Sequence, residues 1–212
     1  MSERAKLLLI GVIGAVLAAA VAVVLLSGGD DQGDPAQVVS KEGNLDPPGQ
    51  VLEPGQAASV VIETSEGSFT IELDTEVAPK TTNSFAYLTE EGFYDGLGFH
   101  RIVPDFVIQG GDPLGDGSGG PGFKTVEAPP SDLSYETGVV AMAKSSDEEP
   151  GTSGSQFFVV TGEGGASLTP EYALVGRVSE GLDVVEQIGR LGGPDEQPTK
   201  TVVIEEATLE TG

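Results

Sequence analysis

The chain has 212 residues, enough for one or two domains, and 38% of them are hydrophobic, which is enough for a packed core. It carries 34 acidic and 10 basic residues, for a net charge of −24, so we expect no binding to the phosphate backbone of a nucleic acid. Cysteine is absent and His100 is the single histidine, which excludes disulfides, thiol nucleophiles and multi-histidine metal sites.

The first predicted element is a membrane anchor. Residues 7–26 form an uncharged, apolar run that spans about 30 Å as a helix, close to the thickness of a bilayer core. Residues 1–6 contain Arg4 and Lys6, and acidic residues follow the run, so we expect residues 1–6 in the cytoplasm and the rest of the chain outside. The alternative is a cleaved signal peptide, which would release a secreted protein.

A linker is predicted over residues 27–57. This segment contains six glycines, four prolines and six acidic residues, and only Lys41 opposes their charge. Such a composition buries too little apolar surface to offset the entropy of ordering, so we expect a flexible, acidic tether.

Residues 58–212 are predicted to form one domain, mainly of strands. Apolar residues alternate in 59–64 and 68–73 around a Glu66–Gly67 turn, which predicts a β-hairpin. Helices are predicted over 79–91, which starts at a proline, and over 180–191, which ends at two glycines. Further short apolar runs predict strands in a sandwich or barrel, and they cover 99–103, 106–109, 138–143, 156–161, 173–178 and 201–207.

Most candidate chemical motifs are weak. Residues 115–120 match G-x-G-x-x-G, but proline and glycine follow where a dinucleotide site needs a helix, so a surface loop is the better interpretation. His100 lacks the serine motif of a catalytic triad, and we expect it to be a packed, hydrogen-bonded side chain.

The most informative stretch is residues 99–112, FHRIVPDFVIQGGD. Two strands joined at Pro104 and Asp105 would bring Arg101, Phe106 and Gln109 together, as a site for an apolar ring beside a carbonyl group. From spacing alone, a surface arginine with two core residues is the alternative.

This stretch closely resembles the signature of the cyclophilins, which are peptidyl-prolyl cis–trans isomerases. The resemblance extends in order over about residues 59–209, through APKTTNSF at 78–85, GFYDG at 92–96, GGPGF at 119–123, GVVAMA at 138–143 and GSQFF at 154–158. It implies a mainly β fold: an eight-stranded antiparallel closed barrel capped by two helices. With the predicted anchor, the chain resembles a membrane-anchored bacterial type.

The resemblance also implies roles for individual residues. Arg101 corresponds to the catalytic arginine, and no metal or cofactor is implied. The walls of the implied proline pocket are Phe106, Phe158 and Leu168, and the residues implied to bind the peptide backbone are Gln109, Ala143 and Gln156. At the rim of the pocket this chain departs from the usual family residues, and the substrate-binding positions there are Val107, Lys144 and Tyr172.

The function implied is isomerisation of X–Pro bonds in exported polypeptides near the membrane, by a monomeric enzyme. The alternative is a non-catalytic module that binds proline peptides on a membrane tether. The presence of Arg101 favours the enzyme, whereas the altered rim residues leave the non-catalytic binding module as an alternative.

Overall fold

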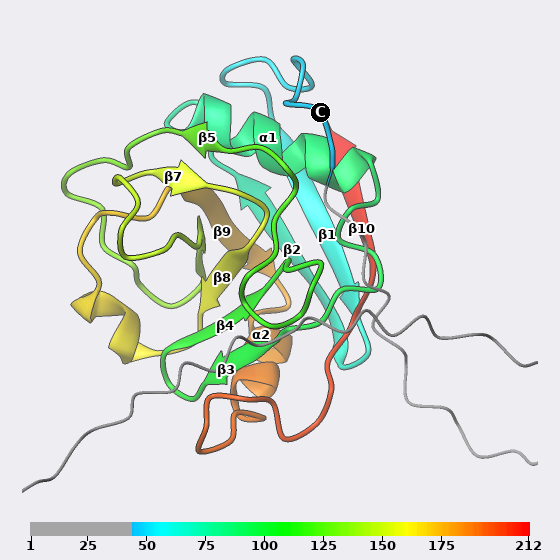
Figure 1. Ribbon diagram of the computed structural model, residues 1–212, viewed down its shortest axis with the longest axis vertical. Helices are drawn as coiled ribbons and strands as arrows, with labels where there is room; N and C mark the ends of the chain where they lie inside the picture. The colour runs from blue at the N-terminus through cyan, green and yellow to red at the C-terminus, as the bar shows by residue number, and fades with distance from the viewer. Residues whose placement is uncertain (1–43) are drawn as a thin grey trace, which may run out of the picture. The chain divides into compact units, whose positions relative to one another are not determined.

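The computed structural model describes residues 44–212 (Figure 1). The predicted cytoplasmic end at 1–6, the anchor at 7–26 and most of the linker lie outside the described residues. Within residues 44–212, no helix has both the length and the apolar character needed to cross a membrane.

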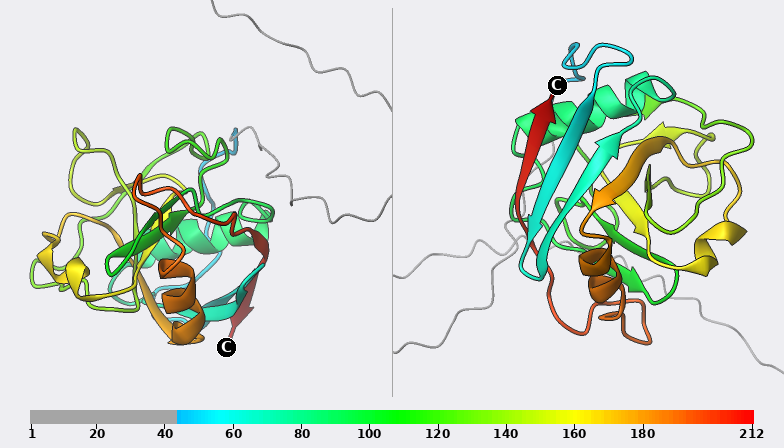
Figure 2. Two further views of the ribbon diagram at one scale, coloured as in Figure 1. Left: turned by 90° about the horizontal axis from the view of Figure 1, so that it is seen from below. Right: turned by 180° about the vertical axis from the view of Figure 1, so that it is seen from behind.

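An eight-stranded antiparallel sheet forms the body of the domain, in the order β10-β1-β2-β9-β6-β8-β4-β3. Register shifts within three of the strand pairs add local twist, which helps the sheet to curl (Figures 1 and 2). Its strands are β1 (Ala58–Thr64), β2 (Gly67–Leu73), β3 (Arg101–Val103), β4 (Val107–Gly110), β6 (Val139–Met142), β8 (Phe157–Val160), β9 (Leu174–Glu180) and β10 (Ile204–Thr211).

The prediction of a closed barrel is wrong, because the edge strands β3 and β10 do not pair with each other. The gap between them is crossed by irregular chain: Phe99 N donates to Val202 O and Ile204 N to Leu97 O. Gly98 and Val203 form only an isolated bridge. Since β3 has only three residues, it is too short to continue the ladder around to β10, and the sheet remains a half-barrel.

Two helices lie at opposite ends of the curled sheet (Figures 1 and 2). Helix α1 (Pro79–Glu90) matches its prediction to within one residue. The carboxylate of Glu127 accepts hydrogen bonds from the backbone N–H groups of Lys80 and Thr81, which provides the cap that Ala78 lacks. Helix α2 (Leu182–Gly189) starts later than predicted, because β9 continues to Glu180 and the next residue is a glycine in the left-handed conformation.

Three short elements were not predicted. Strands β5 (Thr125–Val126) and β7 (Thr152–Ser153) form a separate two-stranded sheet, and a 3₁₀ helix, η1 (Glu163–Ser167), follows β8. Elements of two to five residues are too short to show a period in the sequence.

The sheet separates two hydrophobic clusters. The larger one contains Phe85, Tyr94 and Phe99 around Phe157, with ring centroids 5.4–6.1 Å from that ring. The smaller one contains Phe158 on the opposite face of β8. Because both faces of the central strands are covered, all four residues of β6 and of β8 are buried.

The predicted linker extends too far toward the domain. Residues 44–57 pack on it: Leu45 N donates to Pro121 O, and the backbone N–H groups of Val51 and Leu52 both donate to Asn83 Oδ1, at 2.7 and 2.9 Å. Leu52 is 4% exposed. Leu45 and Val51 pack on the larger hydrophobic core while partly exposed. Asn83 on α1 satisfies backbone groups that composition alone suggested would be solvated.

Candidate active site

The β3–β4 hairpin brings three predicted site residues together. Arg101 and Gln109 lie directly opposite each other in the ladder, and Arg101 Nη1 donates to Gln109 Oε1 at 3.3 Å. The turn places Phe106 so that Arg101 Cζ lies 6.0 Å from its ring centroid. Asp105 holds the turn with φ of 58°, a left-handed conformation that aspartate tolerates. The predicted proximity of Arg101, Phe106 and Gln109 is confirmed.

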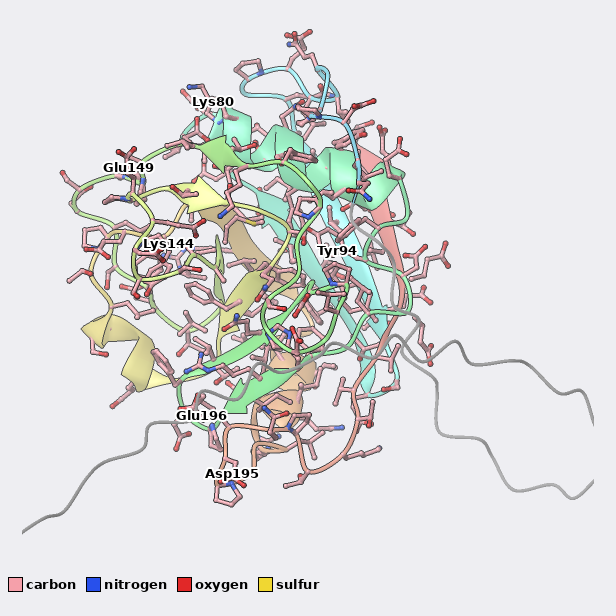
Figure 3. All side chains as sticks on the ribbon, in the orientation of Figure 1. Lys80, Tyr94, Lys144, Glu149, Asp195 and Glu196 are labelled. Atoms are coloured by element: carbon pink, nitrogen blue, oxygen red, sulfur yellow. The ribbon has the colours of Figure 1, made fainter. Side chains whose placement is uncertain are left out.

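Arg101 has a second partner, the carboxylate of Glu196, that the sequence did not reveal. Its Nε donates to Glu196 Oε2 at 2.6 Å, in an ion pair between side chains that are 32% and 52% exposed. Glu196 lies in the loop between α2 and β10, 95 residues further along the chain, so no local motif connects the two (Figure 3).

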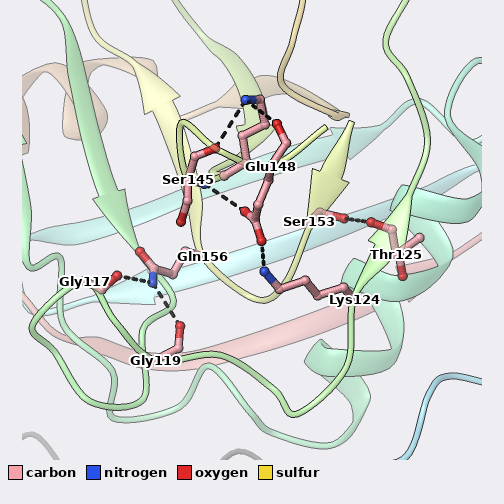
Figure 4. A network of polar contacts seen from close by, with 9 residues as sticks. Gly117, Gly119, Lys124, Thr125, Ser145, Glu148, Ser153 and Gln156 are labelled. Carbon is pink, nitrogen blue, oxygen red and sulfur yellow. Dashed lines mark hydrogen bonds and ion pairs between the residues drawn. The ribbon is translucent and has the colours of Figure 1, made fainter. Parts of the chain in front are cut away.

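A chain of side-chain amides extends from Arg101 to the glycine-rich loop. Gln109 Nε2 donates to Gln156 Oε1 at 3.1 Å. Gln156 Nε2 in turn donates to the carbonyl oxygens of Gly117 and Gly119, both at 2.9 Å (Figure 4). The loop at 115–120 is thus a surface loop, as predicted, and it is tied to the site.

The aromatic side of the site is built on the smaller hydrophobic cluster. Phe158 is 4% exposed and meets Tyr172 edge-on with centroids 5.3 Å apart. Val107 is buried beside it, whereas Phe106 and Leu168 pack on the cluster while partly exposed. The structure therefore gathers the predicted pocket walls on one cluster, between Arg101 and Tyr172.

Tyr135 is a buried member of the smaller cluster, and the sequence did not identify it as a site residue. Its hydroxyl donates to Tyr172 O at 2.8 Å and accepts from Tyr172 N at 2.9 Å. Burial raises the pKa of Tyr135 to about 12, so the hydroxyl keeps its proton and can still donate in alkaline solution. Tyr135 thus fixes the backbone position of a predicted rim residue.

Ala143 and Lys144 continue the site beyond β6. Ala143 N donates to Gln156 O at 2.8 Å. The Lys144 side chain is only 4% exposed: its ammonium donates to Ser145 O and Glu148 O, lies 3.6 Å from a Glu171 carboxylate oxygen and 5.8 Å from the Tyr172 ring centroid. These partners occupy the ammonium of Lys144, which the sequence predicted at the rim of the site.

A groove of about 1010 Å³ adjoins this face. Its lining includes Gln109, Ala143, Gln156 and the loop from Gly117 to Lys124, but not Arg101, Phe106 or Phe158. Lys124 and Glu148 form an ion pair at its margin (Figure 4). The site therefore has two parts, an apolar cluster beside the Arg101 guanidinium and a wider, mostly uncharged groove, and Gln109 joins them.

Comparison with known proteins identifies this arrangement. The family model described as "Cyclophilin type peptidyl-prolyl cis-trans isomerase/CLD" matches residues 59–209. The chain belongs to the cyclophilin family. It is therefore a cyclophilin-type peptidyl-prolyl cis–trans isomerase.

Curated relatives carry the same activity in their names. Peptidyl-prolyl cis-trans isomerase ppi1 of Schizosaccharomyces pombe is 44% identical over 136 residues, covering 62% of this chain and 85% of the relative. Peptidyl-prolyl cis-trans isomerase-like 1 of Aspergillus oryzae is 38% identical over 162 residues, covering 74% and 98%. Both are eukaryotic, and neither gives support to the prediction of a membrane-anchored bacterial type.

A solved cyclophilin of Cryptosporidium parvum has the same fold, with a TM-score of 0.67 at 28% identity over 74% of this chain and 99% of that one. The same C. parvum protein has also been solved in the presence of the dipeptide Ala-Pro.

Within the described part of the chain, His100 does not make the hydrogen bonds that the sequence predicted for it. It is partly buried, but neither ring nitrogen has a hydrogen-bond partner within residues 44–212, so the prediction of a hydrogen-bonded histidine is wrong. Burial lowers the pKa of His100, and the nearby Arg101 lowers it further, against the opposing effect of the Asp112 and Asp116 carboxylates. His100 is thus favoured in its neutral form next to Arg101.

Proposed function

We propose that Arg101 is the catalytic residue of this isomerase and that Phe106, Phe158 and Leu168 hold the proline ring of the substrate. The observation that carries this proposal is the position of the Arg101 guanidinium, held by Gln109 and Glu196 at the edge of the aromatic cluster.

The reaction requires only rotation about the X–Pro bond. Amide resonance sets a barrier of roughly 18–20 kcal/mol. A guanidinium that donates a hydrogen bond to the prolyl nitrogen withdraws its lone pair from conjugation, and this bond is strongest in the twisted state, where the nitrogen is pyramidal. It therefore stabilises the transition state more than either planar isomer. Arginine suits the role because it stays charged and its donors are rigidly arranged.

The remaining residues would bind the substrate while the amide turns. The apolar pocket holds the proline ring, and Gln109, Ala143 and Gln156 bind the peptide backbone where the pocket meets the groove. Lys144 and Tyr172 form the rim. Val107 is predicted on the rim, but it is 2% exposed within the smaller cluster, so it lies beneath the ring instead. No covalent bond, metal or cofactor takes part in the reaction as written.

A test of activity separates this proposal from the alternative, a module that binds proline peptides without catalysis. The full chain in detergent and a fragment of residues 44–212 would be assayed by exchange NMR on a proline peptide, with affinity measured on the same samples. We expect both to accelerate exchange. Binding with no acceleration by either protein would favour the alternative.

We propose further that the enzyme is a monomer anchored by residues 7–26, with its domain outside the cytoplasm and exported polypeptides as substrates. The support is the uncharged run of twenty residues preceded by Arg4 and Lys6. Fractionation should recover the intact chain in membranes after carbonate extraction, with the domain accessible to protease from the outer side. A soluble form that begins near residue 20–30 would show a cleaved signal and a secreted enzyme instead.

A further inference from the structure

Glu196 contacts the strand of Arg101 with both its backbone and its side chain. Glu196 O accepts a hydrogen bond from Ile102 N at 2.8 Å, and its carboxylate accepts the 2.6 Å bond from Arg101 Nε. The backbone contact alone already joins this loop to β3. The carboxylate is therefore not needed to hold the loop in place.

The backbone of Glu196 is in an unfavourable conformation. Its φ is 61°, and among residues 44–212 only Asp105 shares a positive φ without being glycine. The conformation belongs to a tight turn in which Glu196 N donates to Gly193 O and Gly193 N donates to Gln197 O. Glycine adopts such a φ without strain, whereas a residue with a β-carbon does not. The position thus carries a carboxylate where glycine would be the more stable choice.

Two of the three guanidinium nitrogens of Arg101 donate hydrogen bonds to different side chains. Glu196 binds Nε and Gln109 binds Nη1, and within the described residues Nη2 has no hydrogen-bond partner. An arginine side chain has several rotatable bonds, and two contacts on different nitrogens fix the plane of its guanidinium. The nitrogen that remains is then available to donate to the substrate.

We propose that Glu196 is a positioning residue for the isomerase reaction: its carboxylate fixes the Nε edge of Arg101, so that Nη2 donates to the prolyl nitrogen in the twisted state. This inference rests on the proposed role of Arg101. Because fixed donors act on the transition state and hardly on the ground state, Glu196 contributes to kcat and little to KM.

The experiment compares four forms of the full chain: wild type, Glu196→Gly, Glu196→Gln and Asp195→Asn. The glycine variant removes the carboxylate and accommodates the positive φ, so its thermal midpoint should be equal to or above that of wild type. Glutamine keeps an acceptor for Nε without the charge. Asp195 is the exposed neighbour in the same loop and controls for the loss of one negative charge (Figure 3).

We expect Glu196→Gly to lower kcat by about twofold to fivefold, in the range of a partly exposed ion pair, with KM nearly unchanged. Glu196→Gln should recover part of this loss, and Asp195→Asn should match wild type. In ¹⁵N spectra, the Arg101 Nε–H signal should exchange faster with solvent in Glu196→Gly.

An unchanged kcat in Glu196→Gly overturns the proposal, and so does a fall in kcat that accompanies a lower thermal midpoint. Arg101→Ala, assayed in parallel, tests the catalytic role of Arg101 separately from the positioning role of Glu196. If Arg101→Ala loses activity while Glu196→Gly keeps it, only the positioning role fails. If Arg101→Ala keeps full activity, the proposed mechanism fails with it.

Discussion

Replacing Phe158 with alanine tests whether the smaller hydrophobic cluster is a binding pocket. Phe158 is 4% exposed, with ring centroids 5.3 Å from Tyr172 and 6.1 Å from Tyr135. Truncating a buried phenylalanine costs about 3–5 kcal/mol of unfolding free energy. We expect the lower end, about 3 kcal/mol, because half-buried neighbours such as Phe106 can move into the space or admit water.

The effect on binding is smaller but more diagnostic. Phe158 is 4% exposed, which is roughly 10 Å² of its surface, so a proline ring gains about 0.5 kcal/mol from contact with it when the ring's own buried area is counted too. Phe158→Ala should therefore weaken peptide binding by about twofold.

Phe157→Ala is the matched control. The two phenylalanines are neighbours on β8, but Phe157 is fully buried in the larger cluster and contacts Phe85, Tyr94 and Phe99. Its truncation should cost as much stability or more without affecting the pocket. Thermal midpoint and peptide affinity would be measured on both variants at a temperature where both are folded, with the milder leucine variants as a second pair. A Phe158→Ala protein that is destabilised yet binds peptide like wild type would refute the pocket assignment.

Three further outcomes are expected. The pKa of His100 is lower in the folded state than its ordinary value of 6.5, so the unfolded state takes up a proton more readily and stability falls as the pH drops below 6.5. His100→Gln should therefore reduce the fall in thermal midpoint between about pH 7 and 5. Asn83→Ala should cost about 1–3 kcal/mol and expose residues 44–57 to protease, as three hydrogen bonds are lost. Gly181→Ala should destabilise by about 1–3 kcal/mol, since its φ is 74° and a β-carbon would overlap Ser68 O, and differential scanning calorimetry would measure the loss.

The larger part of the fold could be predicted because long elements carry a period. Strands β1 and β2 alternate between buried and exposed residues, and α1 starts at a proline and is followed by a glycine, so their positions were clear from local sequence. Closure of the barrel was not predictable in this way, because it depends on whether two edges far apart in the chain meet. A three-residue β3 and an irregular crossing at residues 96–99 decide that question.

In the candidate site, too, contacts between residues close in sequence could be predicted, whereas contacts between residues far apart in sequence could not. The proximity of Arg101 and Gln109 follows from one tight turn, so it could be predicted from alternation on two short strands. Glu196 and Tyr135 come from other parts of the chain and carry no motif. Only the fold shows that one binds the arginine and the other holds the backbone of Tyr172.

The central claim is that the guanidinium of Arg101 lowers the barrier to rotation without being required for the fold. The most direct test is the exchange rate of a proline peptide with wild type and Arg101→Ala, each at saturating peptide. We predict that the variant retains its thermal midpoint and most of its peptide affinity while kcat falls by about tenfold or more, equivalent to at least ~1.4 kcal/mol of barrier. An Arg101→Ala protein that catalyses exchange at the wild-type rate would contradict the account.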